Sequence, residues 1–206
     1  MHGGLNNMNK IAVISLSGLG VAGAGGWGIY TFTKEKPSTP FSQRIDLGRR
    51  VILETSGTSH DSTWAEVVKE YENKGDIKEI PKGSNVQEKL KQYCQNNKSS
   101  TSNNLEEFRK YQDYCTRENL MTKLSKSWNT SKDENKWTSA ETNYKGSANT
   151  EGDLLIPKDS GNIAKASITK KDIMNHCEAI SSKPFINETD ADYKRGEKWC
   201  TITNND

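Results

Sequence analysis

Residues 64–71, Trp-Ala-Glu-Val-Val-Lys-Glu-Tyr, contain the pattern that decides the fold class. Trp64, Val67, Val68 and Tyr71 recur at positions i, i+3, i+4 and i+7, which places these apolar side chains on one face of a helix. Such a face packs against other elements of the fold. We therefore expect a mainly α fold in which this face belongs to the core rather than to a ligand platform. An α+β fold with short strands is the alternative.

The same spacing recurs 73 residues further along the chain, where Trp137 is followed by Tyr144. Other short motifs recur in the same order: Leu47 with Leu120, Asp76–Lys82 with Asp153–Lys158, Leu90–Cys94 with Ile173–Cys177, and Phe108–Thr116 with Tyr193–Thr201. Ordered matches of this kind indicate an internal duplication. The sequence therefore predicts two small helical repeats in tandem, residues 45–117 and 118–202.

Two more apolar stripes with helical spacing follow in the first repeat: Val86, Leu90, Tyr93 and Cys94, then Leu105, Phe108 and Cys115. Thr63 with Glu66, and Ser84 with Gln87, have the spacing of a capping box. We expect helices to begin at these two boxes.

A short strand is expected at residues 50–55, whose counterpart in the second repeat is not strand-like. Residues 41–57, 95–104 and 130–136 are otherwise polar and lack periodicity, so we interpret them as loops or linkers. The helical signal of the second repeat also weakens over residues 143–151.

The composition leaves little material for a large core. Only 32% of the 206 residues are hydrophobic, and 29 Lys and Arg against 27 Asp and Glu give a net charge of +2. So low an apolar fraction disfavours a large α/β enzyme, whose parallel strands form continuous hydrophobic runs. The near-zero charge provides no strong field for a polyanion, so no nucleic-acid partner is expected.

The segment from Ile11 to Thr33 contains no charged residue. Its 23 residues exceed the roughly 20 that cross a bilayer as a helix, and Gly18, Ala22 and Gly26 form a small-xxx-small face. We expect residues 1–36 to be a membrane anchor that contacts lipid through residues 11–33, followed by a linker at 37–44. A signal peptide cleaved near Ala24 is the alternative. Residues 203–206 are a short tail.

A glycine motif within this segment offers a competing interpretation. Residues 18–23, Gly-Leu-Gly-Val-Ala-Gly, match the G-x-G-x-x-G dinucleotide fingerprint. A dinucleotide fold also needs a stable helix and a second apolar strand after the motif, whereas Gly25, Gly26 and Gly28 weaken such a helix. We therefore expect no cofactor here.

The four cysteines, Cys94, Cys115, Cys177 and Cys200, are the most specific chemical feature of the sequence. An even number in an exported chain favours disulfides, with free buried thiols as the alternative. Counting leaves three pairings open, and the duplication favours Cys94 with Cys115 and Cys177 with Cys200. In a simple helical hairpin these partners would lie roughly 18 Å apart, so the intervening loop must run back along the second helix.

The sequence contains no recognisable catalytic or metal-binding constellation. No C-x-x-C, H-E-x-x-H, P-loop or nucleophile-elbow spacing occurs, and His176 beside Cys177 has only Tyr93 as its counterpart in the first repeat. We therefore predict no catalytic residues, no metal, no small-molecule substrate and no enzymatic activity.

The Gly/Ala-rich segment Leu19–Trp27, the W-x6-Y spacing and the endings Tyr114-Cys115-Thr116 and Trp199-Cys200-Thr201 together define a pattern. This pattern resembles the large, uncharacterised paralogous families of membrane-anchored or exported proteins of haemotropic mycoplasmas. The resemblance implies membrane attachment or export and contact with the host cell, and it implies no catalytic residues.

The functional expectation is a single-pass membrane protein whose C-terminal part is an extracellular interaction or antigenic module that contacts host-cell proteins. The alternative is an accessory membrane subunit that binds another membrane protein through its Gly/Ala-rich helix.

Overall fold

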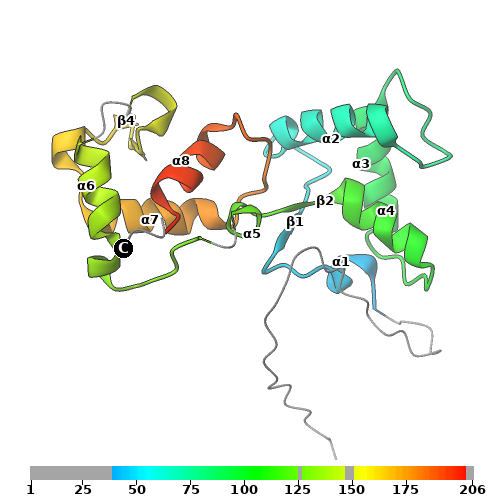
Figure 1. Cartoon of the computed structure of the whole chain (residues 1–206). Helices are drawn as coiled ribbons and strands as arrows, with labels where there is room; N and C mark the ends of the chain where they lie inside the picture. Colours follow the sequence, from blue (N-terminus) through cyan, green and yellow to red (C-terminus); the bar gives the residue numbers. More distant parts are fainter. Residues whose placement is uncertain (1–38, 125–126, 147–150, 203–206) are drawn as a thin grey trace, which may run out of the picture. The chain divides into compact units, whose positions relative to one another are not determined.

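The computed structural model describes residues 39–124, 127–146 and 151–202 (Figure 1). These residues are mainly helical, which confirms the predicted fold class at that level. They form α1 Phe41–Arg44, α2 Asp61–Lys74, α3 Val86–Asn97, α4 Leu105–Cys115, α5 Leu120–Lys123, α6 Thr138–Gly146, α7 Lys170–Ser181 and α8 Ala191–Trp199.

Short strands and 3-10 turns connect the helices. Strand β1 (Arg50–Ile52) pairs antiparallel with β2 (Thr116–Glu118), with Arg50 opposite Glu118. The predicted strand is therefore present over its first three residues. A second hairpin consists of β3 (Pro157–Lys158) and β4 (Gly161–Asn162). The 3-10 turns are η1 Glu134–Trp137, η2 Gly152–Leu154 and η3 Lys165–Ser167.

The predicted membrane anchor at 1–36, its glycine motif and the tail at 203–206 lie outside the described residues. Among the residues that the structure does describe, no helix has the length and apolar character needed to cross a bilayer.

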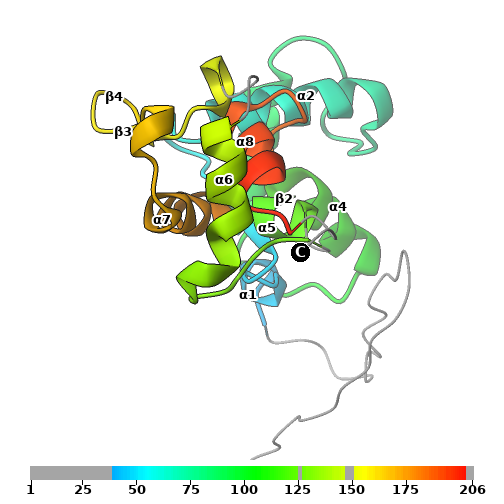
Figure 2. The same cartoon turned by 60° about the vertical axis from the view of Figure 1, so that its left-hand side comes forward.

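Two separate clusters of buried side chains form the core. The first extends from Phe41 to Cys115 and combines residues of α1, β1, α2, α3 and α4. The second extends from Leu120 to Cys200 and combines residues of α5, η1, α6, α7 and α8. Figure 1 shows α3 beside α4 and α7 beside α8, and the helices of each pair contact one another; Figure 2 shows α7 and α8 from another side. Each half of the described chain thus has its own core.

The tryptophan and tyrosine of each W-x6-Y motif are buried and tie helices to loops. Trp64 donates its indole N–H to the Glu54 carbonyl (2.8 Å), and Trp137 donates to the Ser131 carbonyl (2.9 Å). The Tyr144 hydroxyl donates to the Ile163 carbonyl (3.1 Å) and accepts from the Ile156 N–H (3.0 Å). Both motifs therefore combine an apolar ring in the core with a polar atom that fixes nearby main chain.

The predicted capping boxes are not formed. Helix α2 begins at Asp61 after His60, and Thr63 is buried inside its first turn. Helix α3 begins after Asn85, whose backbone is left-handed (φ 61°). In contrast, the Asn104 side chain caps α4 by accepting from the main-chain N–H groups of Glu106 and Glu107. The acids Asp190 and Asp192 lie at the start of α8, with Asp190 as its cap.

Several segments interpreted as loops are ordered elements. Phe41, placed in a linker by the sequence pattern, is fully buried at the start of α1, where the Arg44 guanidinium lies 3.9 Å from the centroid of the Phe108 ring. Helix α3 continues to Asn97 and α6 to Gly146. The first core therefore begins before residue 45, because Phe41 of α1 is one of its buried residues.

Both disulfides of the predicted pairing are present. Cys94 is bonded to Cys115, and Cys177 to Cys200, with Cα–Cα separations of 5.4 and 5.5 Å. Cys94 lies near the end of α3, whereas Cys115 is the last residue of α4. The loop 98–104 must therefore carry the chain back along α4 before that helix begins. The amide N–H of Phe41 donates to the Ser100 carbonyl of this loop (2.8 Å).

The two halves meet around Asn119, which is almost completely buried. Its main-chain N–H donates to the Arg49 carbonyl (2.9 Å), and its side-chain amide donates to the Gly48 carbonyl (2.9 Å). Its side-chain oxygen caps α5. The next amide, that of Leu120, donates to the Lys183 carbonyl (3.0 Å). Hydrogen bonds of Asn119 therefore join the start of the predicted second repeat to the start of the first.

Glycine 75 provides a test of the packing beside the first tyrosine. A Cβ at this position would lie 2.6 Å from three atoms of the buried Tyr71 ring, whose hydroxyl is bonded to two carbonyls. We predict that Gly75→Ala lowers the free energy of unfolding by about 1–3 kcal/mol, because the ring cannot move away freely. Urea denaturation of the full chain measures this. Gly146→Ala, where nothing lies within 4 Å, is the control, and equal effects of both substitutions would contradict the proposed clash.

Each disulfide should contribute separately to stability. The bridges close loops with sequence separations of 21 and 23 residues, so the chain-entropy model gives about 3 kcal/mol for each. We predict that replacing either cysteine pair by alanine lowers the unfolding free energy by about this amount, and that replacing both pairs has a larger effect. Thermal and urea unfolding of the full chain measure it. A double replacement that leaves the midpoint unchanged would contradict a stabilising role.

Candidate binding groove

A groove of about 600 Å³ lies in the first half of the protein. One wall is the loop after α2, residues 77–80, and the other walls come from α3 and the N-terminal part of α4. Its lining is polar and mixed in charge. It includes Tyr93 and three amide side chains of α3, together with acidic and basic residues of α4.

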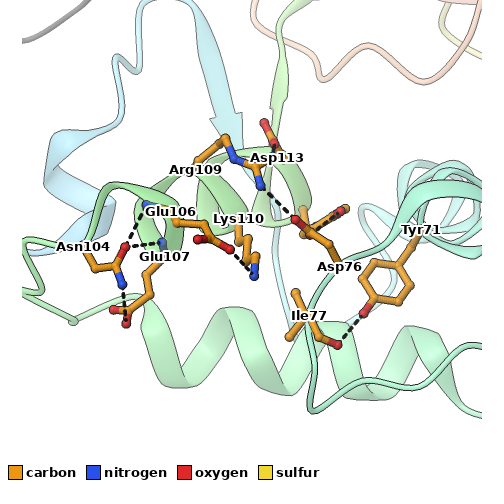
Figure 3. Close-up of polar contacts among 10 residues, drawn as sticks. Tyr71, Asp76, Ile77, Asn104, Glu106, Glu107, Arg109, Lys110 and Asp113 are labelled. Atoms are coloured by element: carbon orange, nitrogen blue, oxygen red, sulfur yellow. Dashed lines mark hydrogen bonds and ion pairs between the residues drawn. The ribbon is translucent and has the colours of Figure 1, made fainter.

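The loop wall is held by a tyrosine of the W-x6-Y motif. The Tyr71 hydroxyl donates to the carbonyl oxygens of Ile77 (3.0 Å) and Ile80 (2.8 Å), whose side chains are themselves buried. Figure 3 shows the Tyr71 hydroxyl directed at the Ile77 carbonyl. Because one side chain fixes both ends of this short loop, the wall has a defined position relative to α2.

Asp76 connects the same loop to α4. Arg109 donates to one Asp76 oxygen (2.8 Å) and Tyr114 donates to the other (3.0 Å), as Figure 3 shows for Arg109. Burial alone would raise the pKa of Asp76, but the hydrogen bonds from Arg109 and Tyr114 outweigh it and hold this pKa below its usual value. The ion pair therefore keeps a charged carboxylate beside the groove at neutral pH.

The start of α4 positions the charged groups of the second wall. Asn104 accepts from the main-chain N–H groups of Glu106 (2.9 Å) and Glu107 (3.4 Å), which fixes the first turn. Lys110 forms an ion pair with Glu106 (2.9 Å), and the two side chains face one another in Figure 3. Glu107 lies in the first turn, where the helix dipole favours a negative charge.

The pKa of Tyr93 shows which charges act inside the groove. The pKa of Tyr93 is raised to about 12, chiefly by burial and in addition by the negative charges of Glu107, Asp76 and Glu79. Three carboxylates from two walls thus act on one ring. The surroundings of Tyr93 favour a positively charged group over a negatively charged one.

The second half also has an ion pair between its last long helix and an aspartate, and an arginine of the chain lies next to this pair. Lys194 pairs with Asp153 (3.2 Å), as Arg109 pairs with Asp76. The next residue, Arg195, is the counterpart of Lys110 and is only 9% exposed. Its Nη1 donates to the Asp153 carbonyl (2.6 Å) and its Nη2 donates to the Asp192 carboxylate (2.8 Å). An arginine of the chain itself therefore fills this position.

His176 stands where the first half has Tyr93. Burial lowers the pKa of His176 to about 4, and the positive charge of Arg195 acts in the same direction, while Asp192 opposes it. The side-chain Nε2 of His176 is buried and accepts no hydrogen bond from the described residues. The positive charge of Arg195 thus acts on His176, whereas negative charges act on Tyr93.

A smaller cavity of about 280 Å³ lies beside the first disulfide, between residues 52–56 and the end of α3. Lys98 and Gln95 contribute to its lining, and Thr55 already donates to Gln95 (2.9 Å). Its polar groups are partly used within the protein, so the larger groove is the better candidate site.

The cysteines singled out by the sequence have a structural role, because all four belong to the two disulfides. Over residues 39–124, 127–146 and 151–202, no cluster of three or more His, Cys, Asp or Glu side chains could hold a metal ion. Sequence analysis missed the groove. The repeated pair of an aspartate after the W-x6-Y helix and a cation near the last cysteine was the signal available for it.

Comparison with known proteins provides no assignment: no family model, no curated protein and no solved structure matches this chain. The function has to be inferred from the groove and the disulfides themselves.

The low pKa of His176 predicts a dependence of stability on pH. The folded pKa of about 4 lies below the ordinary value of 6.5, so protons bind preferentially to the unfolded chain. The stabilisation is complete above about pH 6.5 and is lost as the pH falls toward 4. We predict that His176→Gln reduces the pH dependence of the unfolding free energy in this window by up to about 1.4 kcal/mol per pH unit. Identical pH profiles for the two proteins would contradict this.

Proposed function

We propose that this chain is an exported surface protein whose two disulfide-bridged helical halves form an extracellular interaction module. The observation that carries the proposal is the pair of disulfides, one in each half. Stable disulfides form in oxidising compartments and are rare in the cytosol. A chain with only 32% hydrophobic residues gains most from such cross-links, because its core is small.

The uncharged segment 11–33 supports the same proposal. Its length suits a membrane helix, and a single span would hold the disulfide-bridged part at the cell surface. Cleavage near Ala24 would instead release the same part as a secreted protein. The resemblance to the exported families of haemotropic mycoplasmas adds a proposed setting, namely contact with a host cell.

The matching contacts of the two halves support a duplicated module. Each half has a buried W-x6-Y pair, an ion pair from the last long helix to an aspartate, and a disulfide between two helices. We infer that one small unit was duplicated and that the copies then diverged in their polar surface. A binding module gains from this arrangement, since each copy offers a different surface on one scaffold.

Surface exposure and cysteine state together test this proposal. The full chain, carrying an epitope tag after Asp206, is produced in intact cells, which are treated with protease and with a thiol-alkylating reagent. We predict that the tag is removed by protease without lysis, because the C-terminal part lies outside the cell. Alkylation should modify the four cysteines only after reduction.

A tag placed before Met1 is the control for intact cells, since the anchored orientation protects it from protease. A second variant that lacks residues 1–36 should lose membrane association. A protected C-terminal tag together with cysteines that react without reduction would overturn the proposal and place the chain in the cytosol.

A further inference from the structure

The groove of the first half lacks the group that fills the matching position of the second half. Arg195 donates to a main-chain carbonyl of the loop after α6 and to a carboxylate at the start of α8. Its counterpart Lys110 instead turns to Glu106 on its own helix. The first half therefore retains the walls of the site without the guanidinium between them.

The acceptors for a guanidinium are present in the first half. Asp76 corresponds to Asp153, because each pairs with the cation that precedes Lys110 or Arg195. None of the hydrogen bonds formed among the described residues reaches the main-chain oxygens of Asp76 or Lys78. Glu107, which precedes Phe108 as Asp192 precedes Tyr193, supplies the matching carboxylate.

The charged side chains that line the groove are balanced in number. They are three lysines and three glutamates: Lys78, Lys89, Lys110, Glu79, Glu106 and Glu107. Lys110 pairs with Glu106 (2.9 Å), and Lys89 donates to the Ser84 carbonyl (3.2 Å). The carboxylates of Glu107, Asp76 and Glu79 all act on Tyr93. A cation placed beside Tyr93 would therefore be attracted by these carboxylates, although the lining as a whole carries no net charge.

We propose that the first-half groove binds an arginine side chain presented by a partner protein, with acceptors equivalent to those that hold Arg195. The planar guanidinium donates to a carbonyl and a carboxylate at once, which an ammonium does less well. The ring of Tyr93 offers an additional cation–π surface. The volume of about 600 Å³ also leaves room for the residues that flank the arginine.

This inference deepens the proposed interaction function and rests on it for its biological setting. The binding itself is a property of the purified chain. A chain that is exported but does not bind would refute the groove proposal alone, while a chain that binds but remains in the cytosol would refute the export proposal alone.

Titration with short peptides tests the groove. The full disulfide-bonded chain is titrated with a capped Gly-Ser-Arg-Ser-Gly peptide at low salt, and binding is followed by calorimetry and by amide NMR shifts. The comparison peptides carry lysine or the uncharged isostere citrulline in place of arginine. We expect the arginine peptide to bind at least about tenfold more tightly than either one, with shifts centred on Tyr93 and residues 76–79.

Two substitutions locate the site. Lys110→Arg gives the first half the group that fills the second, so the internal guanidinium should compete and weaken peptide binding by about tenfold. Glu107→Gln removes the carboxylate partner and should also weaken binding, which keeps the test valid if Lys110→Arg fails to fold. Lys145→Arg, the same chemical change on α6, is the matched control and should bind as the unmodified chain does.

Absence of binding, equal affinity for the citrulline peptide, or full binding by both groove variants would overturn the proposal.

Discussion

Each disulfide joins two helices near their C-terminal ends, and the arrangement of each half depends on this constraint. Cys94 and Cys115 are bonded although α4 separates them along the chain, so loop 98–104 must return along that helix. Cys177 and Cys200 impose the same path on the loop between α7 and α8. A small core holds helices weakly by apolar contact alone. The covalent link therefore fixes α3 relative to α4, and these two helices form walls of the groove.

The tyrosines of the two W-x6-Y motifs also stabilise each half, because each packs its ring in the core and bonds its hydroxyl to nearby main chain. Tyr71 fixes the loop at residues 77–80, and Tyr144 fixes residues 156 and 163 in the other half. In each half a tyrosine hydroxyl therefore fixes nearby main chain, although the hydrogen bonds and the nearby charges differ. Two positions near these sites differ between the halves, Lys110 against Arg195 and Tyr93 against His176. Lys110 pairs with Glu106 on its own helix, whereas Arg195 donates to the Asp153 carbonyl.

The sequence predicted those features that depend on periodicity or on repetition. The helical face of Trp64 and Tyr71 and the pairing of the cysteines could be deduced, because each appears twice in the same order. Burial of Phe41 could not, since a lone aromatic residue in a polar stretch has no periodic signal. Leu47 aligned with Leu120, yet it is 65% exposed while Leu120 is buried. The groove was also missed, because its walls come from three segments that only tertiary packing brings together.

The two halves can be compared because each contains an ion pair between its last long helix and an aspartate. If the ion pair between α4 and Asp76 were absent, the difference between Lys110 and Arg195 could follow from a displaced loop. Such an ion pair is present in both halves: Arg109 with Asp76 at 2.8 Å in the first, and Lys194 with Asp153 at 3.2 Å in the second. The difference therefore lies in the side chain that follows the cation. A lysine there reaches a glutamate on its own helix, whereas an arginine reaches across to the opposite wall. The proposed difference between a site that is filled from within and one that is open to a partner therefore depends on the side chain at this one position.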